Sequence, residues 1–227
     1  MRETLILMLY AGLIGAIVLV FLRAVPARHN PLEPADLTQP PGLAAQVQLA
    51  RLKSDREACF TALDEAGVEY LPLEDSPPGA RCALTDALTL GRSLTPYSAP
   101  LRMTCAQTAA LHMWERHIVA PAAAELLGAE LARIETFGSF SCRNIAGSGR
   151  ISQHAFGNAI DISGFRLADG RAVTVLAHWE DGTAKGDFLA RVHQGACGLF
   201  SVTLGPDYNA AHADHFHLDM GRGRLYR

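Results

Sequence analysis

Two short segments of the sequence concentrate side chains that bind metals. The first, SQHAFGNAID at residues 152–161, contains His154 and Asp161, and the second, HADHFH at residues 212–217, ends in two histidines at alternate positions. Imidazole and carboxylate groups are common zinc ligands, and three of them around one ion leave a fourth position open for catalysis. Together the segments predict a catalytic zinc site built from His154, Asp161 and a histidine of the second segment.

Both segments show the alternation of residues that is typical of strands. Asp161 lies between two isoleucines, so we expect it to point away from the side that they bury. Over the predicted strand 215–220, His215 and His217 share one face, and two apolar residues share the other. Gly157 allows the backbone to turn before the first of these strands. One wall is therefore expected to present imidazoles to the side chains of the first segment.

The rest of the chain predicts helices and short strands that position these segments. An amphipathic helix is predicted from the capping residue Thr104 to a stop at Gly128, with a kink at Pro121. The dipeptide at 169–170, Asp-Gly, lies between two strand-like runs and predicts a hairpin. Further helices are predicted at 43–66 and 186–197, strands at 68–73, 131–140, 158–162 and 199–204, and an irregular connection at 74–100. This succession indicates an α+β domain with an antiparallel sheet and flanking helices.

The metal motifs resemble those of known zinc proteins. SxHxxGxAxD followed downstream by HxH resembles the superfamily that includes lysostaphin-type endopeptidases, zinc D-Ala-D-Ala carboxypeptidases and hedgehog signalling domains. More closely, GSFSCRN at 138–144, the segment 154–164 and AHADHFHLD at 211–219 resemble the bacterial family named for an extensin-like C-terminal domain. The resemblance covers roughly residues 55–220. It implies a fold like that of hedgehog domains and D-Ala-D-Ala peptidases.

The resemblance also implies roles for individual residues. The relatives bind zinc through the first His, the Asp and the last His of the two motifs, here His154, Asp161 and His217. Their general base is an acidic residue three positions before the last ligand, which falls on Asp214. An ideal strand turns Asp214 away from His217, so either the strand begins after it or His215 is the base. An upstream arginine that grips a substrate carbonyl or carboxylate corresponds to Arg143.

Neighbouring polar residues are expected to hold the ligands in place. Outer hydrogen bonds commonly orient metal ligands, and Ser152, Asn158 and Asp219 lie close to the motifs in sequence. His212 is a further candidate for such a contact.

The N-terminal part predicts a membrane anchor and a linker. Residues 4–22 are uncharged and mostly apolar, and their length matches the ~20 residues that a helix needs to cross a bilayer. A cleaved signal peptide is the alternative, although the apolar run is long and residues 24–27 form a poor cleavage site. The five prolines in residues 24–43 predict an extended linker. The expected parts are therefore an anchor at 1–23, a linker at 24–43 and a peptidase-like domain at 44–227.

Five cysteines, Cys59, Cys82, Cys105, Cys142 and Cys197, are scattered along the chain without a CxxC pair. Their spacing favours disulfides in an oxidising compartment over a zinc ribbon, with buried free thiols as the alternative. We expect a Cys142–Cys197 bridge, which would hold the segment of Arg143, and a Cys82–Cys105 bridge, which leaves Cys59 unpaired. The alternative is a pairing that includes Cys59. With the predicted anchor, this indicates a single-pass protein of the inner membrane whose catalytic domain lies in the periplasm.

The predicted function is zinc-dependent hydrolysis of amide bonds in peptidoglycan peptides, by a D,D-carboxypeptidase or an endopeptidase. The alternative is a zinc-containing module that binds the cell wall or a protein without hydrolysis, since hedgehog domains keep the scaffold without established peptidase activity. The net charge of −3 gives no electrostatic reason to expect a nucleic-acid partner. The expected partners are a peptidoglycan peptide and, through the N-terminal helix, the membrane.

Overall fold

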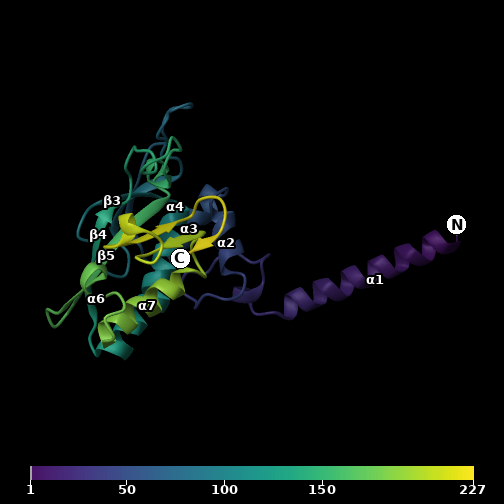
Figure 1. Ribbon diagram of the computed structural model, residues 1–227. Coiled ribbons are helices and arrows are strands. Elements are labelled where there is room, and N and C mark those ends of the chain that lie inside the picture. Colours follow the sequence, from purple (N-terminus) through teal and green to yellow (C-terminus); the bar gives the residue numbers. More distant parts are fainter. Residues whose placement is uncertain (1) are drawn as a thin grey trace.

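Two β-sheets, each packed against helices, form the structure beyond the N-terminal helix α1 (Arg2–Ala24), which projects away from them (Figure 1). The computed structural model describes residues 2–227, without the side chains at positions 2, 5 and 22. The smaller sheet is antiparallel and contains β1 (Glu69–Pro72), β2 (Ala87–Arg92) and β3 (Leu101–Thr104). The larger sheet has the order β4 (Leu131–Gly138), β5 (Ala159–Leu167), β8 (Phe216–Asp219), β7 (Val202–Leu204) and β9 (Leu225–Tyr226), with β6 (Ala172–Thr174) also paired to β5. This architecture confirms the predicted α+β class, and β5 with β6 forms the predicted hairpin.

Helix α4 (Cys105–Trp114) lies at the centre of the core, and all of its residues are buried. As predicted, the Thr104 hydroxyl caps it by accepting a hydrogen bond from the Gln107 backbone N–H. The helix continues through η2 (Glu115–Val119), α5 (Ala120–Ala122) and η3 (Ala123–Leu127), and it ends at Gly128 in the left-handed conformation. The kink predicted at Pro121 stays a prediction. This residue has no N–H to donate, and the turns on either side of it, η2 and η3, are wide π-helical turns.

Four further helices lie around the central helix and the larger sheet. They are α2 (Ala45–Leu52), α3 (Arg56–Glu65), α6 (Val175–His178) and α7 (Ala184–Ala196). Helices α2 and α3 lie against α4, while α7 packs on α4 and on its continuation. The rings of Trp114, Phe165 and Phe188 connect α4, β5 and α7, with centroids 6.0 Å and 4.9 Å apart in succession. Full burial of such side chains stabilises a fold by roughly 1.5–3 kcal/mol each, so this cluster holds the larger sheet on the helices.

The irregular connection predicted for residues 74–100 is wrong in its middle part. Residues 87–92 form β2, the central strand of the smaller sheet, and Ala87, Leu88 and Leu90 are buried. The Pro- and Gly-rich stretches on either side obscure this short strand in the sequence. The strand is stable because both of its edges are paired, to β1 and to β3.

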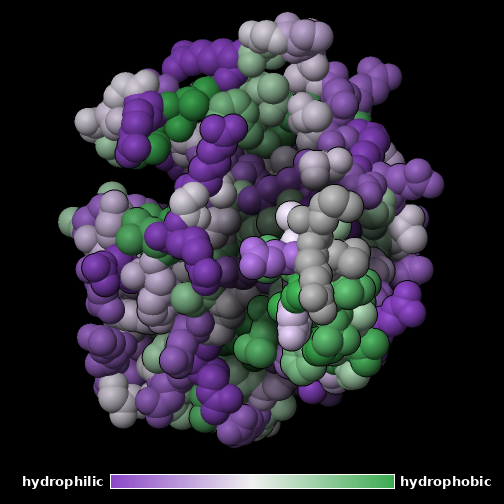
Figure 2. Space-filling view, turned by 90° about the vertical axis from the view of Figure 1, so that its right-hand side faces the viewer, coloured by the Kyte–Doolittle hydropathy of each residue, from purple (hydrophilic) through white to green (hydrophobic). Residues whose placement is uncertain are grey.

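The N-terminal segments differ in part from expectation. Residues 2–24 do form a helix, and its apolar side chains gather as hydrophobic surface where α1 points toward the viewer in Figure 2. Among the helices of the described chain, none combines the length and the apolar character that crossing a membrane requires. The predicted linker packs on the domain: Leu37 is buried, and the Gln48 side-chain amide donates to the carbonyl oxygens of Ala27 and Asn30, each at 2.9 Å.

The cysteine pairing differs from both predicted bridges. Cys59 pairs with Cys105, and Cys82 pairs with Cys142, which leaves Cys197 as the free cysteine among the described residues. The predicted Cys142–Cys197 and Cys82–Cys105 bridges are wrong because α3 lies beside α4, which brings Cys59 to the start of that helix. Cys197 ends α7, and its carbonyl oxygen instead accepts a hydrogen bond from α2. The Cys59–Cys105 bridge is buried, whereas Cys142 is exposed.

Candidate metal centre

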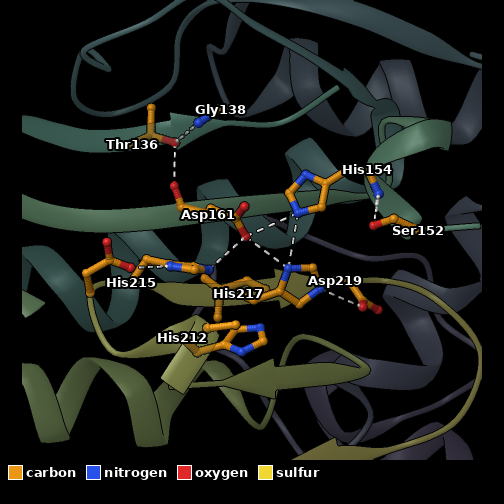
Figure 3. A network of polar contacts seen from close by, with 12 residues as sticks. Thr136, Gly138, Ser152, His154, Asp161, His212, His215, His217 and Asp219 are labelled. Atoms are coloured by element: carbon orange, nitrogen blue, oxygen red, sulfur yellow. Dashed lines mark hydrogen bonds and ion pairs between the residues drawn. The ribbon is translucent and has the colours of Figure 1, made fainter. Parts of the chain in front are cut away.

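His154, Asp161 and His217 point toward one another at the centre of Figure 3. His154 belongs to the short 3-10 helix η4 (Gln153–Phe156), while Asp161 and His217 are direct partners in the antiparallel pairing of β5 with β8. Oδ1 of Asp161 lies 3.1 Å from Nε2 of His154 and 2.9 Å from Nδ1 of His217. The two nitrogens are themselves 3.1 Å apart. The structure thus brings together the three residues predicted as metal ligands.

The outer nitrogen of each imidazole faces an acceptor. Nδ1 of His154 lies 2.6 Å from the Ser139 carbonyl oxygen, and Nε2 of His217 lies 3.0 Å from Oδ2 of Asp219. Carbonyl and carboxylate oxygens accept hydrogen bonds, so both outer nitrogens donate. In neutral imidazoles the inner nitrogens then carry lone pairs. When both imidazoles are neutral, as metal binding requires, three electron-pair donors, the two inner nitrogens and the Asp161 oxygen, therefore face one point.

This arrangement fits zinc. Tetrahedral coordination with bonds of about 2.0–2.1 Å separates ligand atoms by about 3.3 Å, and the three separations here are 2.9, 3.1 and 3.1 Å. Two imidazoles and one carboxylate suit zinc, and the contact of His217 with Asp219 is an outer support that zinc-binding histidines commonly have. The residues present therefore fit the Zn²⁺ predicted from the sequence.

Burial and hydrogen bonding oppose each other in setting the protonation of this cluster. Burial would raise the pKa of Asp161, but hydrogen bonds from His154 and His217 hold this pKa well below its usual range. Burial would lower the pKa of His217, yet hydrogen bonds to Asp161 and Asp219 raise it to about 9. Without metal, a proton on His217 therefore separates the facing electron pairs, and a metal ion must displace that proton.

His215 faces the same cluster from the residue just before β8. Its Nε2 lies 3.6 Å from Oδ1 of Asp161, and its Nδ1 lies 2.8 Å from Oδ1 of Asp214. The Phe137 ring and its imidazole pack in a T-shaped arrangement, with centroids 5.7 Å apart. The strand begins after Asp214, as one of the two predicted alternatives requires, yet the Asp214 carboxylate contacts the His215 ring. The two candidate bases thus form one hydrogen-bonded pair.

Arg143 approaches the cluster from the side of Asp161 that His215 does not contact. Its Nη2 lies 3.5 Å from Oδ2 of Asp161, and 47% of its side chain is exposed. The residue before it, Cys142, is covalently held by Cys82. Arg143 can therefore orient the second oxygen of Asp161 while its guanidinium stays accessible to a carbonyl or carboxylate.

The expected supporting residues are partly in place. Asp219 contacts a ligand ring, and the Ser152 hydroxyl accepts a hydrogen bond from the His154 backbone N–H at 3.3 Å. Asn158 instead donates to the Gln153 side chain at 2.9 Å. The ring of His212 lies 5.1 Å from that of His215, and burial with the neighbouring histidines lowers its pKa to about 4.

Sequence reasoning missed two contacts that hold the ligands. The Ser139 carbonyl orients His154, and the Thr136 hydroxyl donates to the backbone oxygen of Asp161 at 2.6 Å. Because every residue has a carbonyl group, no residue type in the sequence marks the first of these contacts. Thr136 lies in the predicted strand, but its alignment with Asp161 depends on how β4 pairs with β5.

Comparison with protein families gives a match that covers this whole region. A family model described as "Extensin-like protein C-terminus" matches residues 57–227, a range that contains the metal cluster and both disulfides. No curated protein matches the chain significantly.

We expect the full chain to bind one zinc ion per molecule through this cluster. His154→Ala or His217→Ala removes a ligand and should abolish stoichiometric binding, whereas Asp219→Asn should weaken it by about 10–100-fold, because it disturbs only the outer support. Metal content is measured by atomic emission after equilibration with buffered zinc. His178→Ala, which removes an imidazole outside the cluster, should keep full occupancy. Full occupancy in the His154→Ala/His217→Ala double variant would refute the site.

Zinc affinity should depend on pH through His217. This imidazole keeps its proton up to about pH 9 in the metal-free protein, so binding at lower pH should release about one proton. The apparent affinity should then rise about tenfold per pH unit between about pH 6 and 8. Calorimetry in buffers of different ionisation enthalpy counts the protons. His212→Ala should leave the count unchanged, because the pKa of His212 is already lowered to about 4. Zinc binding without proton release would contradict the assignment.

Proposed function

The chain belongs to the extensin-like C-terminal family, and from this premise we propose that it is a zinc-dependent peptidase that hydrolyses amide bonds in peptidoglycan peptides. The observation that carries the proposal is the convergence of three electron-pair donors from His154, Asp161 and His217. The outer nitrogens of the two histidines are already held by hydrogen bonds. The choice of substrate comes from the resemblance of the motifs to zinc D-Ala-D-Ala carboxypeptidases and lysostaphin-type endopeptidases. The same resemblance leads us to propose a hedgehog-like or D-Ala-D-Ala peptidase-like fold for the catalytic domain.

The chain provides the groups that such a hydrolysis needs around the metal. Zinc held by the three ligands would supply a Lewis acid and would lower the pKa of an attacking water to about 7. His215 directs Nε2 toward the cluster and is placed to take a proton from this water and return it to the leaving amine. Asp214 holds the proton on Nδ1 of His215, which leaves Nε2 free to accept. Arg143 binds a substrate carbonyl or carboxylate beside Asp161.

Because Asp214 acts through His215 in this proposal, the effects of their substitution should not add. His215→Ala and Asp214→Asn should each keep zinc and lower the turnover of defined muropeptides by ~10²-fold or more. The double variant should be little worse than His215→Ala alone, since the second change removes a group whose partner is already gone. Product masses and their rates of appearance provide the measurement. Asp187→Asn, a neutralised acid on exposed helix surface, should retain full turnover.

Other outcomes of the same experiment assign different roles. A further ~10²-fold loss on adding Asp214→Asn to His215→Ala would make Asp214 itself the base. Zinc-loaded protein that binds muropeptides but releases no product would support the alternative of a non-hydrolytic wall-binding module.

We also propose that the domain works in the periplasm, attached to the inner membrane through α1. Two disulfides form in the structure, as is common in oxidising compartments. Helix α1 exposes large apolar side chains that would gain free energy from contact with lipid; they include Leu9, Leu13, Ile17, Val20 and Phe21.

In protein taken from native membranes, the number of free thiols should show whether the domain lies in an oxidising compartment. After alkylation and non-reducing peptide mapping, we expect the pairs Cys59–Cys105 and Cys82–Cys142 and one alkylated thiol at Cys197. Flotation of native membranes in neutral buffer should carry the full chain with the membranes and leave behind a variant that lacks residues 1–23. Five alkylated thiols would refute the periplasmic location, and failure of the full chain to float with the membranes would refute attachment.

A further inference from the structure

A cavity of about 640 Å³ lies beside the metal centre and is lined by none of the three predicted ligands. Its walls come from the end of α2, the turn before β2, the start of α4, the helix η4 and the segment after β8. This volume lies within the range of about 300–1,000 Å³ that is usual for small-ligand sites. We propose that the cavity is a second binding site, which takes a peptide by its carboxylate group.

Cationic side chains dominate the charged part of the cavity wall. The Lys53 ammonium donates to the Met220 carbonyl oxygen, which leaves its other N–H groups available. Arg222 forms no hydrogen bond or ion pair with any residue that the structure describes. The carboxylate of Asp86 also lines the cavity, and the guanidinium of Arg56 is shared between Asp86, at 2.8 Å, and Asp75, at 3.2 Å. Among the residues that line the cavity, two cationic side chains therefore outnumber one carboxylate, and the nearby Asp219 carboxylate also acts on the charge of Lys53.

The start of α4 adds to this positive character. The first turn of a helix has N–H groups without acceptors inside the helix, and the helix dipole makes that end partly positive. The N–H of Cys105 reaches the backbone oxygen of Asp86 at 2.7 Å, and that of Gln107 reaches the Thr104 hydroxyl at 3.2 Å. Ala106, between them, lines the cavity. An anion in the cavity therefore meets a favourable backbone as well as two cations.

The apolar part of the wall indicates which class of anionic ligand fits the cavity. Leu52, Phe156 and Met220 line the same cavity, and Leu52 and Met220 are buried. A group with a single negative charge next to apolar atoms matches both parts of the wall, whereas inorganic phosphate would leave the apolar part unused. The forked guanidinium of Arg222 and the point charge of Lys53 suit a carboxylate. A peptide that ends in a carboxylate has this combination.

The cavity adjoins the metal centre without sharing its ligands. Gln153, which lines it, precedes His154, and Met220 follows Asp219. The inferred site thus goes beyond the proposed hydrolysis and can be tested in protein from which metal has been removed.

Calorimetry on the chelator-treated full chain tests the site, with acetyl-alanyl-alanine as the probe and its C-terminal carboxamide as the neutral match. The acid should bind, and the carboxamide should bind at least about tenfold more weakly, because it lacks the charge that Lys53 and Arg222 recognise. Lys53→Met and Arg222→Ala should each weaken binding of the acid by about tenfold. Lys185→Met and Arg224→Ala make the same charge changes outside the cavity and should leave the affinity unchanged.

Several outcomes would overturn the inference. Equal affinity for acid and carboxamide, or no effect of Lys53→Met and Arg222→Ala, would show that the cavity does not recognise a carboxylate. Inorganic phosphate binding as tightly as the acid would overturn its assignment to a peptide. Loss of binding in His154→Ala would place the probe at the metal centre. Retained carboxylate binding in a protein without zinc affinity or turnover would refute the proposed hydrolysis and leave this site standing.

Discussion

The antiparallel pairing of β5 with β8 places Asp161 directly opposite His217, and the metal cluster depends on this register. On the other face of the same strands, the isoleucines that flank Asp161 pair with Phe216 and Leu218, and all four apolar side chains are fully buried. Because side chains alternate along a strand, a slip of one residue would send both ligands into the core and the apolar residues to the site. The hydrophobic core thus holds the two ligands in position.

The third ligand depends on contact between the two sheets. His154 lies in η4, whose following residue, Gly157, has φ +63° and accepts a hydrogen bond at its carbonyl oxygen from the Thr104 N–H at 2.8 Å. A Cβ atom at position 157 would come within 3.3 Å of the Met103 Cα atom and 3.4 Å of the Arg102 carbonyl oxygen, both in β3. Glycine is therefore required here both by the backbone conformation and by the close approach of the smaller sheet. Packing of β3 against this turn therefore fixes the position of the His154 backbone, from which its ring extends.

The exposed rim of the site is held differently, because it has no core beneath it. Most of residues 141–150, which carry Arg143, are exposed and lie outside the helices and named strands. The Cys82–Cys142 disulfide and a hydrogen bond of 2.8 Å between the side chains of Arg81 and Asn144 tie this segment to residues 81–82. A covalent link replaces hydrophobic burial at the place where the side chain must remain accessible. The inner ligands and the outer arginine thus owe their positions to different forces.

Local patterns in the sequence determined much of this protein. Ligand types, the Thr104 cap, the stop at Gly128 and the Asp169-Gly170 turn are visible there because each depends on neighbouring residues. The motifs also identified the family, since residue types and their order can be compared without knowledge of the fold.

Only the tertiary structure decided the contacts between distant segments. The pairing of Cys59 with Cys105 depends on how α3 lies on α4, and the joining of Asp214 to His215 depends on where β8 begins. The strand β2 became recognisable only through its pairing with β1 and β3. The cavity beside the metal centre is likewise formed by segments far apart in the chain, which bring Lys53 and Arg222 to one wall. Distances between such segments are set by the packing of the whole chain, which residue spacing does not encode.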